Sequence, residues 1–156
     1  ANLGDLDLAQ AVADRLEDLS SQSPSNTTLN LISMEISALT MFKKGQEDEA
    51  VALLMEAVSV AENQSPPRGA ASPLKPVHEL AGDLLLAMGS HDKAAELYET
   101  SLGRMANRPR ALLGAARSYA GMSDEYNARQ KFQAFYSLWK DTFSISSSWS
   151  TANKTQ

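Results

Sequence analysis

The stretch GSHDKAAELYETS, residues 89–101, decides the fold, because a related stretch, SDEYNARQKFQAF, follows 34 positions later as residues 123–135. Small and aromatic residues coincide when the two stretches are superposed: Ala94 with Ala128, and Tyr98 with Phe132. A third copy, GQEDEAVALLMEA at residues 45–57, lies 44 positions upstream of the first stretch, which is one period plus ten inserted residues. A repeat of this length predicts pairs of α-helices that bury their apolar faces by stacking.

Apolar residues recur at helical spacing in segments separated by Gly, Pro, Ser and Asn, which favours helices joined by short turns. Gly45 is expected to end a helix at its C′ position, and Ser90 and Ser123 are expected to cap the helices that follow them. The tail, residues 143–156, is too rich in Ser and Thr for a helix, and its Phe143-Ser144-Ile145 alternation favours an extended strand. The expected helices are residues 4–20, 28–43, 47–62, 76–88, 91–105, 110–122 and 124–140.

The same repeat positions carry residues of similar size in all three copies. With the small residue of the second helix numbered 20, position 8 is Ala38, Gly82 and Ala116, position 20 is Ala50, Ala94 and Ala128, and position 24 is Leu54, Tyr98 and Phe132. The pattern resembles the tetratricopeptide repeat family, except that the family's Trp at position 4 is replaced by Met34, His78 and Leu112. The resemblance implies an all-α, right-handed solenoid of antiparallel helix pairs, a fold whose usual role is to hold another protein.

This register divides the chain into repeats and connecting segments. The leading helix resembles the second helix of an incomplete earlier repeat, so we expect the array to continue upstream and the chain to be a piece of a longer protein. The expected divisions are the leading helix and its loop (1–26), repeat 1 (27–64), a Pro-rich insertion (65–74), repeat 2 (75–108), repeat 3 (109–142) and the Ser/Thr-rich tail (143–156).

A closer resemblance is carried by PVHELAGDLLL, residues 76–86. This segment, with residues 48–54 and 111–117, is similar to an uncharacterised family of larger, exported tetratricopeptide proteins that are common in bacteria. The resemblance covers roughly residues 30–140. It implies an extracytoplasmic or secreted location and no known activity.

The first helix of each repeat is expected to line the concave groove. Glu35 and Leu39 stand where carboxylate-clamp co-chaperones of this class have Lys and Asn, which argues against that function. Arg110 and Arg117 are candidates for pairing with an acidic peptide; the alternative is that they are solvated or paired within the groove. The predicted groove residues are Glu35, Leu39, Phe42, Glu79, Asp83, Leu86, Arg110, Leu113 and Arg117.

Composition gives no support to several other functions. The net charge of −5 and the pI of about 5.0 do not favour nucleic-acid binding, and no apolar run is long enough for a membrane span. The chain has no cysteine, and its two histidines lack metal-ligand spacing: His78 is expected to pack and His91 to be exposed. Glu79 and Asp83 share a helical face, where a solvated pair is favoured over acid–base catalysis. We therefore expect no metal, cofactor or enzymatic activity.

Three Asn-x-Ser/Thr triplets begin at Asn26, Asn63 and Asn153. They are glycan acceptors if the protein passes through a eukaryotic secretory pathway, and chance occurrence is the alternative.

Three functions remain after these exclusions. The leading hypothesis is a non-catalytic interaction scaffold that binds a peptide or a neighbouring subunit in its groove. The second is a structural subunit of an exported, N-glycosylated complex that packs against copies of itself. The third is an enzyme whose catalytic domain lies upstream of this chain.

Overall fold

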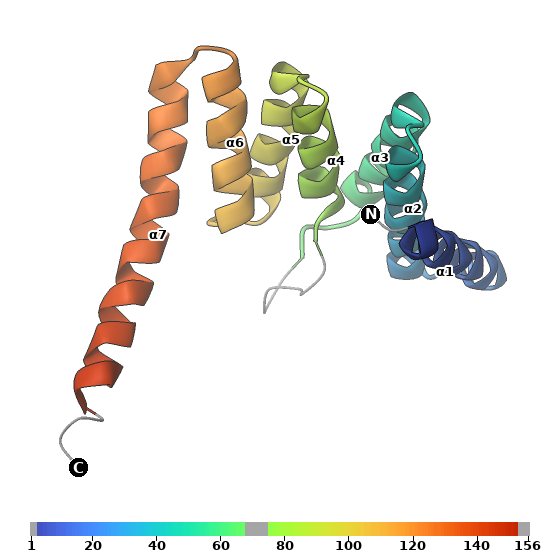
Figure 1. The fold of residues 1–156 in the computed structure, drawn as a ribbon, viewed down its shortest axis with the longest axis horizontal. Helices are drawn as coiled ribbons and strands as arrows, with labels where there is room; N and C mark the ends of the chain where they lie inside the picture. The colour runs from blue at the N-terminus through green and yellow to red at the C-terminus, as the bar shows by residue number, and fades with distance from the viewer. Residues whose placement is uncertain (1–2, 68–74, 153–156) are drawn as a thin grey trace. The chain divides into compact units, whose positions relative to one another are not determined.

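The computed structural model describes residues 3–67 and 75–152, and within them the chain is all α-helical (Figure 1). The fold class agrees with the prediction, because successive helices pack against one another in pairs. The helices are α1 (Leu3–Gln22), α2 (Thr27–Lys43), α3 (Glu47–Glu62), α4 (Val77–Ala87), α5 (His91–Arg104), α6 (Pro109–Gly121) and α7 (Glu125–Ala152).

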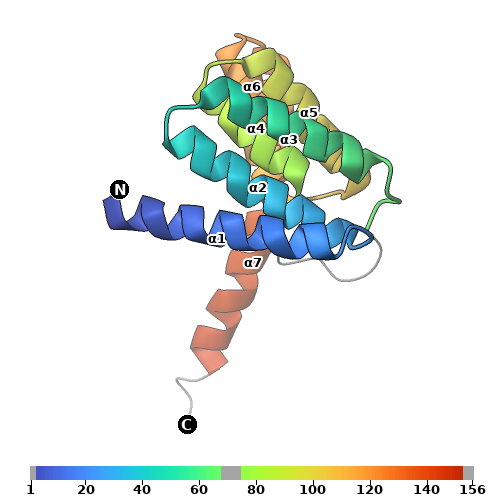
Figure 2. The same cartoon turned by 90° about the vertical axis from the view of Figure 1, so that its right-hand side faces the viewer.

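The chain forms two compact units, Ala1–Leu84 and Leu85–Gln156, so that the division falls within α4. In the first unit α1 packs on α2, and α2 packs on α3 (Figure 2). In the second unit α5 packs on α6, and α6 packs on α7. The helices α2 to α6 bury apolar residues, whereas α1 exposes Leu8 and Val12, and α7 exposes Tyr126, Phe132 and Tyr136.

Small side chains occupy the positions where the repeat requires them. Ala38 and Ala50 are fully buried in the first unit, and Ala94 and Ala116 are buried in the second. Residues of this size allow two helix backbones to approach closely, because no long side chain separates them. At these four positions the observed burial agrees with the predicted register, whereas Ala128, at position 20 of the third repeat, is half-buried.

A left-handed residue ends the first helix of each repeat. Gly45, Gly89 and Ser123 have φ angles of +83°, +78° and +61°, and these three residues are equivalent in the repeat. After each one, a backbone N–H donates to the carbonyl oxygen five residues earlier; for Ser90 to Leu85 the distance is 2.9 Å. This is the Schellman arrangement, which satisfies the last carbonyl groups of a helix and reverses the chain.

The prediction that Ser123 caps α7 is wrong. Ser123 instead occupies the left-handed C′ position after α6, and the N-cap is Asp124, whose Oδ1 accepts the Asn127 N–H at 3.1 Å. The hydrogen bonds from Asn127 lower the pKa of the Asp124 carboxyl group. Ser90 does stand at the N-cap of α5, as predicted, but its side chain makes no capping hydrogen bond.

The expected extended tail is helical. The backbone of α7 continues through Phe143-Ser144-Ile145 to Ala152, and residues 153–156 lie outside the described part of the chain. Serine costs a helix only a few tenths of a kcal/mol relative to alanine. Extending a helix that is already nucleated by packing requires much less free energy than starting a new one. The Ser- and Thr-rich composition of the tail therefore led to a wrong prediction of its secondary structure.

The closest packing in the second unit joins α5 and α6. The ring of Tyr98, which is 0% exposed, lies against Gly114, and a Cβ atom at that glycine would overlap three of the ring carbons. Glycine is therefore needed at position 114 because a larger residue would overlap the Tyr98 ring, and not because of its backbone conformation, which is helical. Gly103 on α5 differs, because a Cβ there would meet no atom within 4 Å.

We predict that Ser123→Gly raises the free energy of unfolding by about 0.5–1 kcal/mol, because it removes left-handed strain from a residue with a side chain. The matched variant Gly89→Ala should lower it by about 1 kcal/mol, since its Cβ would meet no neighbour and only the backbone strain remains. Urea denaturation checks both values. An unchanged or lower stability of Ser123→Gly would contradict the assignment of this turn.

We predict that Gly114→Ala lowers the free energy of unfolding by about 1–3 kcal/mol, because the added methyl group overlaps the buried Tyr98 ring. Gly103→Ala is the control and should raise the stability by about 0.5–1 kcal/mol, as expected for an unhindered helical glycine. Thermal and urea unfolding measure both variants. If the two substitutions change the free energy of unfolding equally, the contact with Tyr98 does not restrict the size of the residue at position 114.

Candidate functional site

In the first unit, Glu35 on α2 lies near Lys75, which precedes α4. Glu35, Leu39 and Phe42 are all half-buried on α2. Lys75, two residues before α4, forms an ion pair with Asp83 and also acts electrostatically on Glu35. The structure therefore brings together two carboxylates and one ammonium group, of which the sequence analysis had selected only the carboxylates.

Glu35 has the most perturbed acid–base behaviour of this cluster. Burial raises the pKa of its carboxyl group from 4.5 to about 7, and the positive charge of Lys75 offsets part of this increase. Desolvation dominates because the surroundings of α2 stabilise the neutral carboxyl group better than the charged one. Glu35 therefore exchanges a proton near neutral pH, so that the charge of this surface varies with pH.

Glu79 does not line an accessible groove, contrary to the prediction. Its side chain is fully buried, whereas Asp83, four residues later on α4, is exposed and paired with Lys75. Helical spacing places both residues on one side of α4, but it does not decide which of them reaches solvent. The two carboxylates therefore do not form an exposed pair that a substrate could reach.

In the second unit, α6 has a buried face and an accessible face. Ala111, Leu112 and Ala115 are buried. Arg110 and Arg117 are exposed, seven residues apart on the opposite side of the helix, with the half-buried Leu113 between them. This spacing puts the three side chains on one stripe of the helix. The remaining predicted groove residue of this unit, Leu86 at the end of α4, is half-buried.

Two of the three asparagines of the glycosylation triplets, Asn26 and Asn63, take part in helix capping. The Oδ1 of Asn26 accepts the Leu29 N–H at 3.1 Å at the start of α2, and the Nδ2 of Asn63 donates to the Ser59 carbonyl at 3.0 Å at the end of α3. Asn153 lies outside the described residues. Neither the structure nor the comparisons with known proteins support a glycoprotein.

The sequence analysis missed a polar cluster that joins three helices of the second unit. The Glu99 carboxylate accepts the Tyr119 hydroxyl at 3.1 Å and the Lys131 ammonium at 2.6 Å, which links α5 to α6 and α7. Burial raises the pKa of the Tyr119 hydroxyl, and the charge of Glu99 raises it further. The repeat gave no signal for this cluster, because the residue one period after Glu99 is Gln133 and not Lys131.

The two histidines serve packing. His78 is buried, as predicted, and its Nε2 lies 3.4 Å from the Glu62 Oε1 atom. His91 was predicted to be exposed, but it is half-buried against Gly121, where a Cβ would lie 2.5 Å from its Nδ1. The prediction was wrong because residue 91 begins α5 beside the end of α6, a proximity that only the tertiary structure creates.

The described part of the chain offers neither a group of metal ligands nor a membrane-spanning helix. No three His, Cys, Asp or Glu side chains within it are grouped so that they could hold a metal ion. None of its helices is both long and apolar enough to cross a membrane.

The fold matches solved structures of MamA, a tetratricopeptide-repeat protein. The TM-score is 0.61 against a crystal structure of MamA at 18% sequence identity, over 84% of this chain and 64% of that one. Against MamA of MSR-1 it is 0.60 at 20% identity, over 86% of this chain and 70% of that one. Against MamA of AMB-1 it is 0.60 at 21% identity, over 82% of this chain and 62% of that one. At such identities the match shows the fold alone.

The chain spans less than two thirds of the length of two of these three MamA structures. No protein-family model matches the chain, and a comparison with curated protein sequences finds no match. The predicted repeat architecture is thus supported by structural similarity. The finer resemblance to exported bacterial proteins remains a prediction.

We predict that Glu35→Gln makes the protein more stable than the wild type at pH 8, by about 1–2 kcal/mol after allowance for its partial exposure. A carboxyl group whose pKa rises from 4.5 to about 7 on folding binds its proton more tightly in the native state. The wild type therefore loses stability between these two pH values, and the glutamine variant has no such loss at this site.

Urea denaturation at pH 4, 6 and 8 tests this prediction. The stability difference between Glu35→Gln and the wild type should be smallest at pH 4 and largest at pH 8. Glu49→Gln, at an exposed glutamate at the start of α3, is the control and should show little difference at any pH. A difference that shrinks as the pH rises would have the wrong sign and would refute the burial of Glu35.

Proposed function

We propose that this protein is a non-catalytic scaffold that binds a protein partner, and that the accessible stripe of α6 binds an acidic segment of that partner. The tetratricopeptide-like fold supports the first part, because stacked helix pairs usually present surfaces to other proteins. The observation that carries the second part is the exposed pair Arg110 and Arg117, which flanks Leu113.

The spacing of the two arginines suits a peptide with regularly placed carboxylates. Seven residues of α-helix span about 10 Å along the helix axis. An extended peptide covers a similar distance in about three residues. Each guanidinium group presents a planar set of donors that matches a carboxylate in two parallel hydrogen bonds. Leu113 offers an apolar contact between the two charges, so an acidic segment with an apolar residue between its carboxylates is the expected ligand.

The surface of the first unit has a different character. Lys75 is already paired with Asp83 and lies near Glu35, so this region does not offer an uncompensated cation to an acidic ligand. Leu39 and Phe42 are half-buried and contribute apolar surface on α2. We therefore assign the acidic-segment site to α6 in the second unit and not to α2.

The location of the protein is part of the proposal. The resemblance of roughly residues 30–140 to larger exported tetratricopeptide proteins supports an extracytoplasmic site of action. Fractionation of the source cells, with detection of the chain by antibody, tests this assignment. Recovery only in the cytoplasmic fraction would refute it.

We predict that Arg110→Glu/Arg117→Glu weakens binding of a fluorescent peptide with Glu at every third position by at least tenfold, measured by fluorescence anisotropy. Loss of one charged hydrogen bond in an interface costs about 1.5–3 kcal/mol, which is roughly tenfold or more in affinity. The same peptide with Gln in place of Glu should not bind the wild type.

The control reverses two lysines that are exposed elsewhere. Lys43→Glu/Lys93→Glu changes the net charge by the same amount and should leave most of the affinity intact. If both double variants lose affinity equally, binding depends on net charge alone and the α6 site is refuted. If the wild type fails to bind the Glu peptide, the acidic-segment assignment is refuted.

A further inference from the structure

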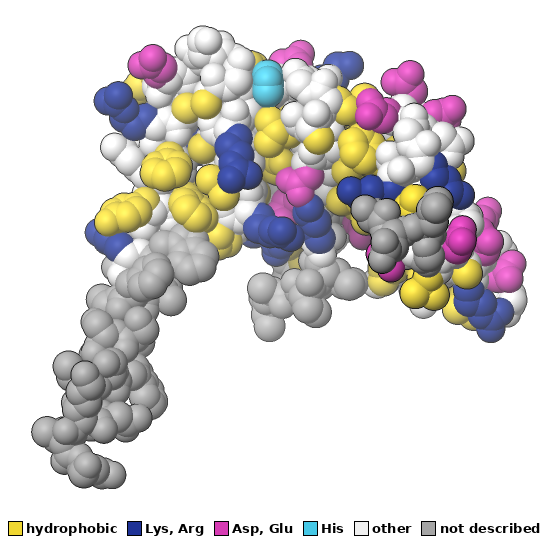
Figure 3. All heavy atoms as spheres, viewed as in Figure 1, with side chains coloured by type: hydrophobic (Ala, Val, Ile, Leu, Met, Phe, Trp, Pro, Cys, Tyr) yellow, Lys and Arg dark blue, Asp and Glu magenta, His cyan; other side chains and the backbone are white. Residues whose placement is uncertain are grey.

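The outward side of α7 carries a stripe of exposed residues at helical spacing. We call this stripe the α7 face. Figure 3 shows hydrophobic side chains gathered over the described part of this helix. The members of the α7 face, all exposed, are Glu125, Arg129, Phe132, Gln133, Tyr136 and Lys140.

Within the described residues, a repeat position that is buried in the earlier repeats is exposed on this face. Leu54 and Tyr98, which occupy the same repeat position as Phe132, are each 0% exposed. In the second unit Tyr98 is covered by α6 through its contact with Gly114. Phe132 is 53% exposed, and no helix within the described residues covers it. The position that is otherwise a core position is therefore presented to solvent.

The composition of the face resembles the centre of a protein interface. Phe132 is accompanied by Tyr136, which is 61% exposed, and by Tyr126, which is 72% exposed at its edge. Arg129 shares the helical stripe of Phe132 and Tyr136. Aromatic residues and arginine are the types enriched in interface cores and in binding hot spots. An aromatic cluster of this kind on a helix indicates an interaction surface.

The charges on the α7 face are complementary to those on the same face of a second copy. If two α7 helices lie antiparallel around a twofold axis near Phe132, Glu125 stands opposite Lys140 of the second copy. The same pairing places Arg129 opposite Tyr136 of the second copy, where a guanidinium group stacks favourably on an aromatic ring. Both pairings occur twice, as a twofold interface requires. A parallel pairing would instead put like charges together.

We propose that the α7 face binds the α7 face of a second copy of this chain, as an antiparallel pair. The occupant is thus a second copy, and the site is distinct from the α6 stripe that we assign to an acidic segment. From Glu125 to Lys140 the contact would extend about 22 Å along the helix. A contact of one helix per copy is small, so the dimer is expected to be weak and concentration-dependent.

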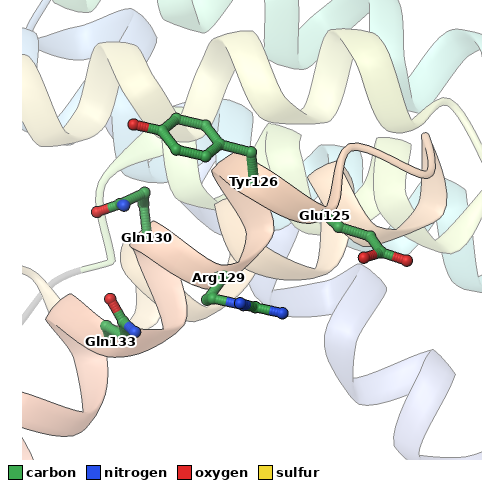
Figure 4. A pocket seen from close by; sticks show the side chains of 5 residues that line it. All are labelled: Glu125, Tyr126, Arg129, Gln130 and Gln133. Atoms are coloured by element: carbon green, nitrogen blue, oxygen red, sulfur yellow. The ribbon is translucent and has the colours of Figure 1, made fainter.

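A surface hollow on α7 adds to the shape of this face. It has a volume of about 430 Å³, and its walls are Glu125, Tyr126, Arg129, Gln130 and Gln133 (Figure 4). All five lining residues belong to one helix, so the hollow opens outward beside the Phe132 position. In the antiparallel pair, the ring of Tyr136 from the second copy enters this hollow beside Arg129.

Sedimentation equilibrium at low ionic strength, from about 1 to 500 µM protein, tests the proposal with the whole chain. The wild type should dimerise, and Phe132→Asp or Tyr136→Asp should weaken dimerisation at least tenfold. Circular dichroism shows whether each variant remains folded, and having two independent aromatic variants guards against misfolding of one. A wild type that is monomeric throughout the concentration range would overturn the proposal.

Charge exchange identifies the geometry. Glu125→Lys or Lys140→Glu alone should weaken the dimer, because each places like charges opposite one another. The double variant Glu125→Lys/Lys140→Glu should restore dimerisation, and so should a one-to-one mixture of the two single variants. Lys93→Glu on α5 is the control and should change nothing. Failure of both restorations would overturn the antiparallel pairing.

A head-to-tail arrangement is the other outcome that the test resolves. On α1, Leu8 is 66% exposed and Val12 is 44% exposed, on a helix rich in aspartate and glutamate. If Leu8→Asp abolishes association while Glu125→Lys leaves it unchanged, α1 is the occupant and the α7 pairing is wrong. If Leu8→Asp has no effect and the charge exchange restores the dimer, the α7 pairing stands.

Discussion

The reversal of the chain after the first helix of each repeat is the constraint on which the rest of the structure depends. Two consecutive helices can pack antiparallel through a short loop only if one residue adopts a left-handed conformation and the last carbonyl groups find partners. Gly45, Gly89 and Ser123 supply this residue. In each repeat the small residue at position 20 follows five residues later. The turn therefore fixes which face of the second helix meets the first.

Once this register is set, the packing of the second unit follows from residue size and from one shared carboxylate. Tyr98 fits against α6 because Gly114 has no side chain. The large residue on one helix thus packs against the small residue on the other. Glu99 then accepts hydrogen bonds from Tyr119 and Lys131, so one side chain of α5 connects α6 and α7. Apolar packing and a half-buried polar cluster thus act on the same helices of the second unit.

A fold built from stacked pairs leaves helix faces without partners, and in this chain those faces differ in charge. In the first unit, the exposed Asp83 is paired with Lys75, and the half-buried Glu35 changes its charge near neutral pH. In the second unit, α6 presents arginines, and α7 presents aromatic residues between an acidic and a basic end. Such differences allow one scaffold to hold chemically different partners on different helices, which is the advantage of a repeat architecture for binding.

The sequence by itself determined the helices, their pairing and the positions of the small core residues. Few folds other than stacked helix pairs are compatible with a 34-residue period and regular apolar spacing. Glycines such as Gly45 and Gly89 mark the ends of helices in the local sequence. The sequence also selected the accessible stripe of α6, because Arg110, Leu113 and Arg117 follow helical spacing. These properties depend on interactions within a few turns of the chain or between adjacent repeats.

Only the tertiary structure decided which of these residues reach solvent and what they touch. Glu79 is buried and Asp83 is exposed, although both follow the same pattern, and Phe132 is exposed where its counterpart Tyr98 is covered. The raised pKa of Glu35, the contact of His91 with Gly121 and the continuation of α7 through the serine-rich segment were likewise not readable from local sequence. Burial and desolvation depend on neighbours that are distant in the chain, whereas periodicity records only the direction in which a side chain leaves its own helix.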